Sequence, residues 1–275
     1  RVTRQTGQVQ TPSASPDGRE LVYLSDNGGH GNLWVTRVDA GGVRQLTFER
    51  DRATAIGAPT WSPTGNRIVF VINRDQPALW LINGDGRGLR QLVSSGFAAS
   101  WSRDGEWIYY LPSSGAPTWC IEKIHVDSGE RIVVRDDHNS HGPLEGAGVF
   151  YYARRTERSG REWEICHTAL AGGEPHVIAR ISRSRVPVSP DFIQGALSPD
   201  GRWIALPLVD GATTEIWLLP TDGGKMRTIT DFGDRQTLVA RQVSWAPDGR
   251  CIYAAVAETA TAVVLLDGLL SAISA

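Results

Sequence analysis

A short turn motif that returns along the chain at a nearly regular spacing constrains the fold of this sequence more than any other feature. Proline fixes the backbone at the first turn position, and Asp and Gly accept the later positions, so a Ser-Pro-Asp-Gly corner reverses the chain. Repetition of such a unit every few tens of residues is typical of repeat architectures. The motif and its variants occupy residues 15–19, 62–66, 102–106, 198–202 and 246–250.

The spacing of these turns predicts six units. Successive turn glycines are 47, 40, 96 and 48 residues apart, so the third step is two periods long. We therefore expect a further unit near residue 150, where residues 146–152 (GAGVFYY) contain the kind of aromatic strand that follows the turn at 102–106. Six units in 275 residues leave about 46 residues each, which matches the four-stranded blade of a β-propeller.

Each unit contains a pattern of four short strands. The second is apolar without polar alternation, as in residues 68–71 (IVFV), which predicts burial on both faces. The third ends at a Gly-rich corner such as residues 84–86 (GDG), which favours a hairpin. The predicted blades are approximately 8–48, 49–93, 94–135, 136–180, 181–231, and 232–275 plus 1–7.

The predicted fold is therefore an all-β, six-bladed β-propeller of four-stranded antiparallel blades, in a single domain over residues 1–275. Residues 2–6 look like a fourth strand with no first three before it, and the last unit has a plausible third strand at 262–266. We expect the N-terminal strand to join the last blade and close the ring, because closure removes an exposed sheet edge. The apolar residues 269–273 receive no assignment.

The SPDG turns, the third strands of the LWL type and the fourth strands of the RQLT type resemble the TolB-like six-bladed propeller family with WD40-like repeats. The resemblance covers nearly the whole chain. It implies one of three uses: a protein-binding propeller of the bacterial periplasm, a gating propeller beside a prolyl-oligopeptidase-type hydrolase, or a sensor domain. It also favours the periplasm or cell envelope, with the cytoplasm left open. A fold shared this widely does not fix activity.

Charge and hydropathy argue against two classes of partner. The chain has 28 basic and 30 acidic side chains with no block of like charge, so the basic stripe of a nucleic-acid-binding protein is not expected. No run approaches the roughly 18 apolar residues that a membrane helix requires, so direct membrane insertion is not expected. The chain starts with Arg1, which we interpret as a mature or excised piece. Its oligomeric state is left open.

Tryptophans and cysteines are both predicted to be structural. Tryptophans that recur at equivalent blade positions indicate core packing rather than sugar stacking. Three cysteines in strand-like runs predict buried, unpaired thiols rather than a disulfide framework. The recurring tryptophans are Trp34, Trp80 and Trp217 at one position and Trp61, Trp101 and Trp245 at another, and the cysteines are Cys120, Cys166 and Cys251.

The sequence favours a binding module, because it contains no catalytic serine elbow, zinc-protease motif or phosphate-binding loop. No cofactor is expected. Loops that join one blade to the next surround one mouth of the channel, and their arginines can hold a protein segment or a small anionic ligand through forked hydrogen bonds. The alternative is that neighbouring aspartates neutralise them as surface pairs. The predicted rim residues are Arg50, Asp51, Arg52, Asp136, His138, His141, Arg183, Arg185, Asp234 and Arg235.

The segment DDHNSH at residues 136–141 leaves an enzymatic alternative open. His138 and His141, with the aspartates beside them, are possible ligands of a divalent metal. Oligogalacturonate lyase resembles this propeller class and uses a histidine-bound metal, but its ligands come from several blades and nothing here matches them one by one. No metal ligand or catalytic residue is therefore assigned, and a solvated polar loop is the simpler interpretation. The alternatives to a binding module are a lyase of that type and the gating propeller of a hydrolase.

Overall fold

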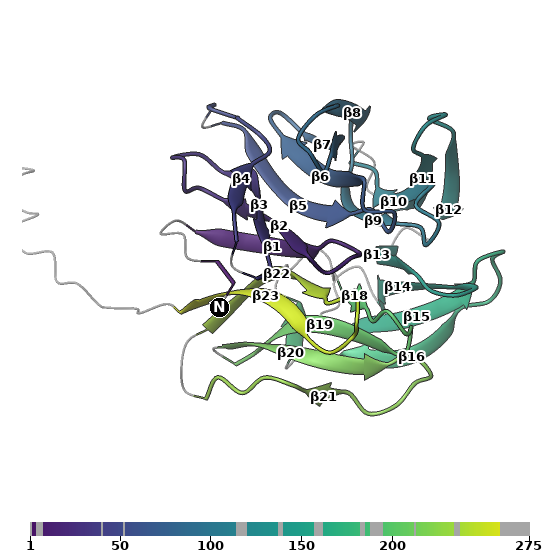
Figure 1. Cartoon of the computed structure of the whole chain (residues 1–275). Helices are drawn as coiled ribbons and strands as arrows, with labels where there is room; N and C mark the ends of the chain where they lie inside the picture. Colours follow the sequence, from purple (N-terminus) through teal and green to yellow (C-terminus); the bar gives the residue numbers. More distant parts are fainter. Residues whose placement is uncertain are drawn as a thin grey trace, which may run out of the picture.

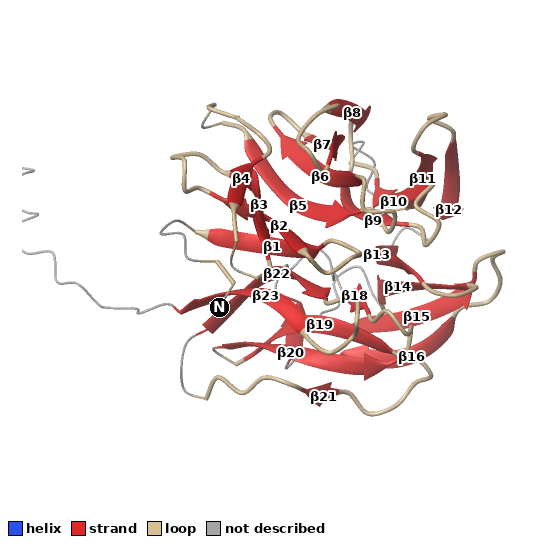
Figure 2. Ribbon diagram, viewed as in Figure 1, coloured by secondary structure: helices blue, strands red, loops and turns tan. Residues whose placement is uncertain are grey.

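The fold was analysed in a computed structural model that describes residues 2–3, 8–39, 41–51, 53–113, 120–136, 140–156, 162–181, 185–187, 195–211, 213–233 and 237–258. These residues form strands and connecting turns, with no helix among them (Figure 2). The sheets follow one another around a ring in chain order (Figure 1). The predicted all-β, six-bladed β-propeller is therefore confirmed.

Every blade is an antiparallel sheet whose strands pair in sequence order. In blade 5, β17 and β18 both pair with β19 and together take the place of a first strand. In blade 6 the described strands are β22 and β23. The strands are β1 (Val9–Ala14), β2 (Glu20–Ser25), β3 (Asn32–Arg37) and β4 (Val43–Gln45) in blade 1; β5 (Ala55–Trp61), β6 (Arg67–Asn73), β7 (Pro77–Asn83) and β8 (Arg90–Val93) in blade 2; β9 (Phe97–Trp101), β10 (Trp107–Leu111), β11 (Ile121–His125) and β12 (Arg131–Arg135) in blade 3; β13 (Ser140–Glu145), β14 (Val149–Arg155), β15 (Trp163–Ala169) and β16 (His176–Ile181) in blade 4; β17 (Arg185–Pro187), β18 (Ala196–Leu197), β19 (Trp203–Asp210), β20 (Thr213–Pro220) and β21 (Arg227–Thr228) in blade 5; and β22 (Thr237–Trp245) and β23 (Ile252–Glu258) in blade 6.

The first strands of the blades form the inner wall of the ring. β1 contacts β5 and β22, β9 contacts β5 and β13, and β18 contacts β13 and β22. The described inner wall is therefore continuous from blade 6 back to blade 1. The predicted closure by an N-terminal strand falls largely on residues 4–7 and 259–275, which lie outside the described residues.

The inner strands of blades 1 to 4 carry a bulge at the same place. In β1 the pairing shifts between Gln10 and Ser13, and β5, β9 and β13 shift at equivalent positions. A bulge bends a strand and increases its twist. Three non-glycine residues take positive φ there, Thr11 (46°), Ala58 (50°) and Ala98 (54°). That conformation costs of order 1–3 kcal/mol per residue, so backbone strain is concentrated along the channel wall.

The repeated turn folds as predicted. In blade 1 the amide of Gly18 donates to the carbonyl of Ser15 at 2.9 Å, and Ser15 Oγ donates to Asp17 Oδ1 at 2.6 Å. The amide of Arg19 also donates to Asp17 Oδ1. Gly18 has φ 71°, a value that glycine adopts at the lowest cost. The same hydrogen bonds recur at Ser102, Asp104 and Glu106 and at Ser198, Asp200 and Arg202.

The turn aspartates predict a loss of stability in acid. The hydrogen bond from Ser102 lowers the pKa of Asp104 most, and the amide of Glu106 adds to it against an opposing effect of burial. A carboxyl whose pKa is lower in the folded state stabilises the fold above its unfolded pKa, and this contribution is lost as the pH falls through the folded value. We expect Asp104→Asn to lower the melting temperature at about pH 6 and to differ less from wild type at about pH 3. A difference in melting temperature between wild type and Asp104→Asn that is the same at both pH values would contradict this explanation. The turn of blade 2 has Thr64 at the aspartate position, and Asn66 Oδ1 accepts from the hydroxyls of Ser62 and Thr64, so Asn66→Ala is a control without titration.

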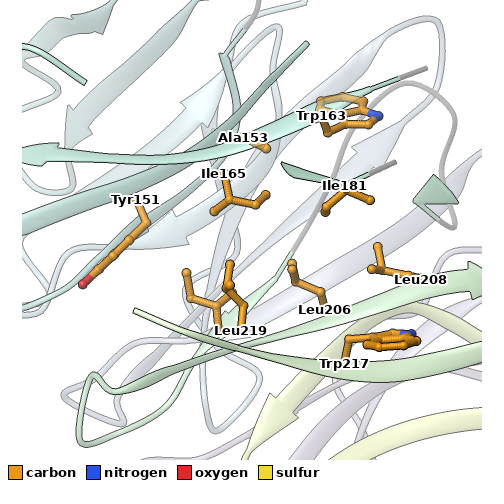
Figure 3. Close-up of a cluster of buried hydrophobic side chains, with 10 residues drawn as sticks. Tyr151, Ala153, Trp163, Ile165, Ile181, Leu206, Leu208, Trp217 and Leu219 are labelled. Carbon is orange, nitrogen blue, oxygen red and sulfur yellow. The ribbon is translucent and has the colours of Figure 1, made fainter. Parts of the chain in front are cut away.

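Apolar side chains fill the spaces between neighbouring blades. Between blades 4 and 5, side chains of β14 and β15 face those of β19 and β20 (Figure 3). Of the recurring tryptophans, Trp61, Trp101 and Trp217 are buried and the other three are partly buried, which supports the predicted packing role. The cysteines are free, but only Cys166 is buried and Cys251 is exposed. The prediction of buried thiols is therefore wrong for Cys251, because its strand-like surroundings belong to a turn.

Candidate functional site

A cavity of about 390 Å³ lies where the inner strands of the six blades end. Each inner strand runs toward its turn, so the cavity is at the end of the channel that the SPDG-type turns surround. We call it the channel cavity. Its wall combines apolar side chains with hydroxyls and two charged residues. It is lined by residues 13–14, 16, 60–63, 98–103, 142–145, 195–197, 199, 242–245 and 247.

A set of hydroxyl side chains connects neighbouring blades around this cavity. Ser13 Oγ in blade 1 accepts from the amide of Trp61 in blade 2 at 3.1 Å, and Ser244 Oγ in blade 6 accepts from the amide of Ala14 in blade 1 at 3.0 Å. Ser100 Oγ donates to the carbonyl of Pro143 at 2.6 Å. These bonds join blades 1 and 2, blades 6 and 1, and blades 3 and 4. They therefore hold neighbouring inner strands together at the cavity.

Gln242 reaches from blade 6 past blade 1 to blade 2. It lies on β22 in blade 6, is 7% exposed, and its Nε2 donates to the carbonyl of Pro59 in blade 2 at 3.2 Å and to Thr60 Oγ1 at 3.4 Å. Gln242 Oε1 is buried and has no hydrogen-bond partner among the described residues. Such a group is costly to leave unmatched. The floor of the cavity therefore offers a hydrogen-bond acceptor, with the Thr60 hydroxyl proton as a donor beside it.

Tryptophan side chains strengthen the wall between blades. Trp101 Nε1 donates to the carbonyl of Thr60 at 3.0 Å, and Trp245 Nε1 donates to the carbonyl of Ala196 at 2.9 Å. Each bond reaches from one blade to the blade before it. Trp61 instead packs over Gly84, where a Cβ would lie 2.7 Å from the indole. These indoles are fixed parts of the wall.

The predicted rim lies at the opposite end of the inner strands. Arg50 and Asp51 precede β5, whereas Trp61 at its other end lines the cavity. Arg50, Asp51 and Asp136 are exposed. For His141 and Arg185 the strand is described but the side chain is not. Arg52, His138, Arg183, Asp234 and Arg235 lie outside the described residues.

An ion pair and three hydrogen bonds hold the described residues of this rim. Glu49 Oε2 pairs with Arg74 Nη2 at 3.1 Å, and Glu49 Oε1 accepts from the amides of Arg50 and Asp51. The amide of Asp51 lowers the pKa of Glu49 most, followed by Arg74. Asp51 Oδ1 accepts from the amide of Ala53 at 2.9 Å. Ligand binding by the rim stays a prediction. Among the described residues, no three His, Cys, Asp or Glu side chains are grouped to hold a metal ion.

Sequence reasoning missed the cavity residues. Ser13, Thr60, Ser100 and Ser244 occupy the same position, two residues before the first turn residue of their blade. This recurrence could have been seen in the sequence. The contact of Gln242 with blade 2 could not, because it joins residues 183 apart in the chain.

Comparison with known sequences identifies one family over most of the chain. The family model described as the TolB β-propeller domain matches residues 1–194. The Tol-Pal system protein TolB of Francisella tularensis is 22% identical over 258 residues, which cover 90% of this chain and 56% of the relative. The uncharacterized peptidase YuxL of Bacillus subtilis is 25% identical over 207 residues, which cover 71% of this chain and 29% of the relative. The chain therefore spans about a third to just over half of these relatives.

Solved structures share the fold at low sequence identity. A TolB-like protein of Agrobacterium tumefaciens superposes with a TM-score of 0.73 at 20% identity, over 94% of this chain and 93% of the other. An oligogalacturonate lyase in complex with manganese gives 0.60 at 11% identity, over 90% and 72%. A prolyl endopeptidase gives 0.57 at 12% identity, over 93% and 51%. The same architecture thus occurs in proteins described as enzymes and in proteins described as TolB.

Proposed function

The chain belongs to the TolB β-propeller family, and from this premise we propose that it is a non-catalytic binding module that holds an extended segment of a partner protein in the channel cavity. The channel cavity is the observation that carries this proposal. All six blades line it, and about 390 Å³ is within the range of about 300–1,000 Å³ usual for ligand pockets. A space bounded by six rigid sheets is preorganised, so little ordering is needed on binding.

The chemistry of the floor fits a peptide backbone. Each residue of an extended segment presents one N–H donor and one C=O acceptor. Gln242 Oε1 can accept from such an N–H. The hydroxyls of Ser13 and Thr60 can donate to such a C=O, because each accepts a hydrogen bond within the protein and keeps its own proton for a ligand. The lining between these groups is mostly apolar, as expected of a site that also holds a side chain.

The proposal extends to the compartment and to the rim. We place the module in the bacterial periplasm, which is supported by relatives named as Tol-Pal system proteins. A small anionic ligand at the predicted arginine rim remains a separate proposal, for which the exposed Arg50 is the described support.

Gln242→Leu is expected to weaken binding of a peptide by about 2–10-fold, because a neutral hydrogen bond contributes about 0.5–1.5 kcal/mol. Leucine keeps most of the volume and removes both the amide donor and the acceptor. Binding is measured by fluorescence polarisation with a labelled peptide selected from a random dodecapeptide display library. Gln91→Leu is the matched control, because Gln91 is exposed on the outer strand β8. Equal affinities of all three proteins would show that the floor does not contact the peptide.

Photocrosslinking tests the location of the site directly. The selected peptide is synthesised with a benzophenone side chain, irradiated with the propeller, and mapped by mass spectrometry. We expect crosslinks in segments 13–16, 60–63, 98–103 and 242–247, which line the channel cavity, and their loss when unlabelled peptide competes. Crosslinks confined to the outer strands, or failure to select any peptide, would refute the proposed function.

One observation favours a second candidate function. The chain aligns over 207 residues with a peptidase of which it covers only 29%. A propeller of this kind could belong to a longer hydrolase and control access to its active site. Labelling of the full-length natural polypeptide with a fluorophosphonate reagent would support this candidate, and absence of labelling would leave the binding module.

A further inference from the structure

The wall of turns around the channel cavity is not uniform. In blade 3, Trp101 pairs with Ile108 and the turn occupies residues 102–107. In blade 4, Glu145 pairs with Phe150 and the turn occupies residues 146–149. The blade 4 turn is two residues shorter and is closed by a single hairpin bond from the amide of Gly146 to the carbonyl of Val149. The wall is therefore lowest at blade 4.

The other turns interlock around the ring. A Cβ placed on Gly65 in blade 2 would lie 3.1 Å from Pro16 Cγ in blade 1, and one on Gly105 in blade 3 would lie 3.4 Å from Pro63 Cγ in blade 2. The same contact joins Gly18 to Pro247 and Gly249 to Pro199. Each of these four turn glycines thus packs on the proline of the preceding blade.

The glycine-on-proline contact is absent on both sides of blade 4 in the described part of the chain. Among the described residues, no atom lies within 4 Å of a Cβ placed on Gly148 in blade 4 or on Gly201 in blade 5. Blade 3 carries Arg103 and blade 4 carries Ala147 where the four other blades carry proline. Other contacts connect the blades around blade 4: the amide of Arg103 donates to Glu145 Oε1, and a Cβ placed on Gly146 would lie 3.5 Å from Leu197 Cδ2. We call the sector from blade 3 to blade 5 the notch, because its wall has the shorter turn and, among the described residues, lacks the glycine–proline contacts.

Arg103 provides an unpaired charge at this notch. Its side chain lines the cavity and is exposed, and no described residue forms an ion pair with its guanidinium. The neighbouring Glu145 is already occupied, because its Oε2 accepts from the hydroxyl of Tyr109 at 2.6 Å and its Oε1 from the amide of Arg103 at 3.2 Å. A guanidinium without a carboxylate partner is free to form forked hydrogen bonds with one.

We propose that the segment held in the channel cavity enters through the notch at blade 4 and places a carboxylate on Arg103. This inference rests on the proposed function and adds the class of ligand and its direction of entry. The carboxylate belongs to an Asp or Glu side chain or to a C-terminus. A phosphate is less suited, because Asp104 and Glu145 lie beside Arg103 and repel a doubly charged group more strongly.

The test uses two arginines on the same face of the disc. Random dodecapeptides are selected by display on the wild-type protein, on Arg103→Glu and on Arg202→Glu. Arg202 lies in the turn of blade 5 and is exposed, but it does not line the cavity. We expect peptides from wild type and Arg202→Glu to be enriched in Asp and Glu or to require a free C-terminus, and peptides from Arg103→Glu to lack this preference.

Affinity measurements separate the sources of the carboxylate. A selected peptide is compared with its amidated form and with a form in which each Asp or Glu is replaced by Asn or Gln. Loss of one charge-assisted contact is expected to weaken binding to wild type by about 10–100-fold. Neutralising the same carboxylate of the peptide should hardly change its affinity for the Arg103→Ala variant. Loss of affinity in the amidated peptide would identify the C-terminus as the source of the carboxylate, and loss in the Asn or Gln form would identify a side chain.

The failures of the two proposals differ. Peptides that bind wild type and crosslink in the cavity without any acidic preference, or that bind Arg103→Ala and wild type equally, overturn the role of Arg103 and leave the proposed function intact. Failure of wild type to select any peptide overturns both. Equal loss of affinity in Arg103→Glu and Arg202→Glu assigns the effect to the general charge of this face and also overturns the inference.

Discussion

Trp101→Ala is expected to lower the free energy of unfolding by about 3–5 kcal/mol, the usual cost of truncating a large buried aromatic side chain. The side chain is 8% exposed and packs with Ile108 and Tyr110 in the apolar cluster between blades 2 and 3. Its Nε1 also donates to the carbonyl of Thr60 in the blade before it. Truncation removes this packing and leaves the carbonyl without that donor. Urea unfolding followed by circular dichroism measures the change.

Two variants separate the contributions of Trp101. Trp101→Phe keeps most of the apolar surface and loses the N–H, so we expect a smaller loss of about 1–2 kcal/mol. Trp107→Ala removes an indole that is only partly buried and has Lys123 over its face. We expect it to lower the free energy of unfolding less than Trp101→Ala does. If Trp101→Ala and Trp107→Ala lowered the free energy of unfolding equally, the contact of Trp101 with blade 2 would not contribute specially to stability.

Gly84→Ala is expected to lower the free energy of unfolding by about 1–3 kcal/mol, because the added methyl group enters a space that is already filled. A Cβ at this position would lie 2.7 Å and 2.8 Å from two ring atoms of Trp61. The indole is buried against residues of blade 1, so it can yield only by disturbing that cluster. The melting temperature and the urea midpoint report the effect.

Gly57→Ala is the matched control for Gly84→Ala. Gly57 lies on β5 in the same blade, has no positive φ, and no atom lies within 4 Å of a Cβ placed on it in the described structure. Alanine there should leave stability unchanged or raise it by up to about 1 kcal/mol, because it restricts the unfolded chain. Similar losses in both variants would show that the glycines are needed for backbone freedom and not for the space that Trp61 occupies.

The strands and turns could be predicted from the sequence because their determinants are local. The turn at Ser15 to Gly18 is held by groups within five residues of one another, and an apolar run such as residues 68–71 is recognisable by itself. Six repeats of such a unit leave few possible arrangements, since each blade must cover the apolar faces of its neighbours.

The candidate site could not be predicted in the same way because its parts come from all six blades. Ser13, Ser100 and Gln242 each resemble ordinary strand residues, and only ring closure brings them to one cavity. The notch was missed for a related reason. A unit near residue 150 was expected from the spacing, but the shorter turn after Glu145 becomes evident only from the pairing of Glu145 with Phe150.

The hydrogen bond between Ala14 and Ser244 also constrains the order in which the blades can assemble during folding. These residues are 230 positions apart, so the inner strand of blade 1 lacks its blade 6 neighbour until about 230 further residues have been synthesised. At a translation rate of about 5–20 residues per second, this delay is about 10–50 s. Contacts of such long range make folding slow and leave apolar strand faces uncovered in the meantime. During this interval, β1 therefore needs protection from wrong pairing.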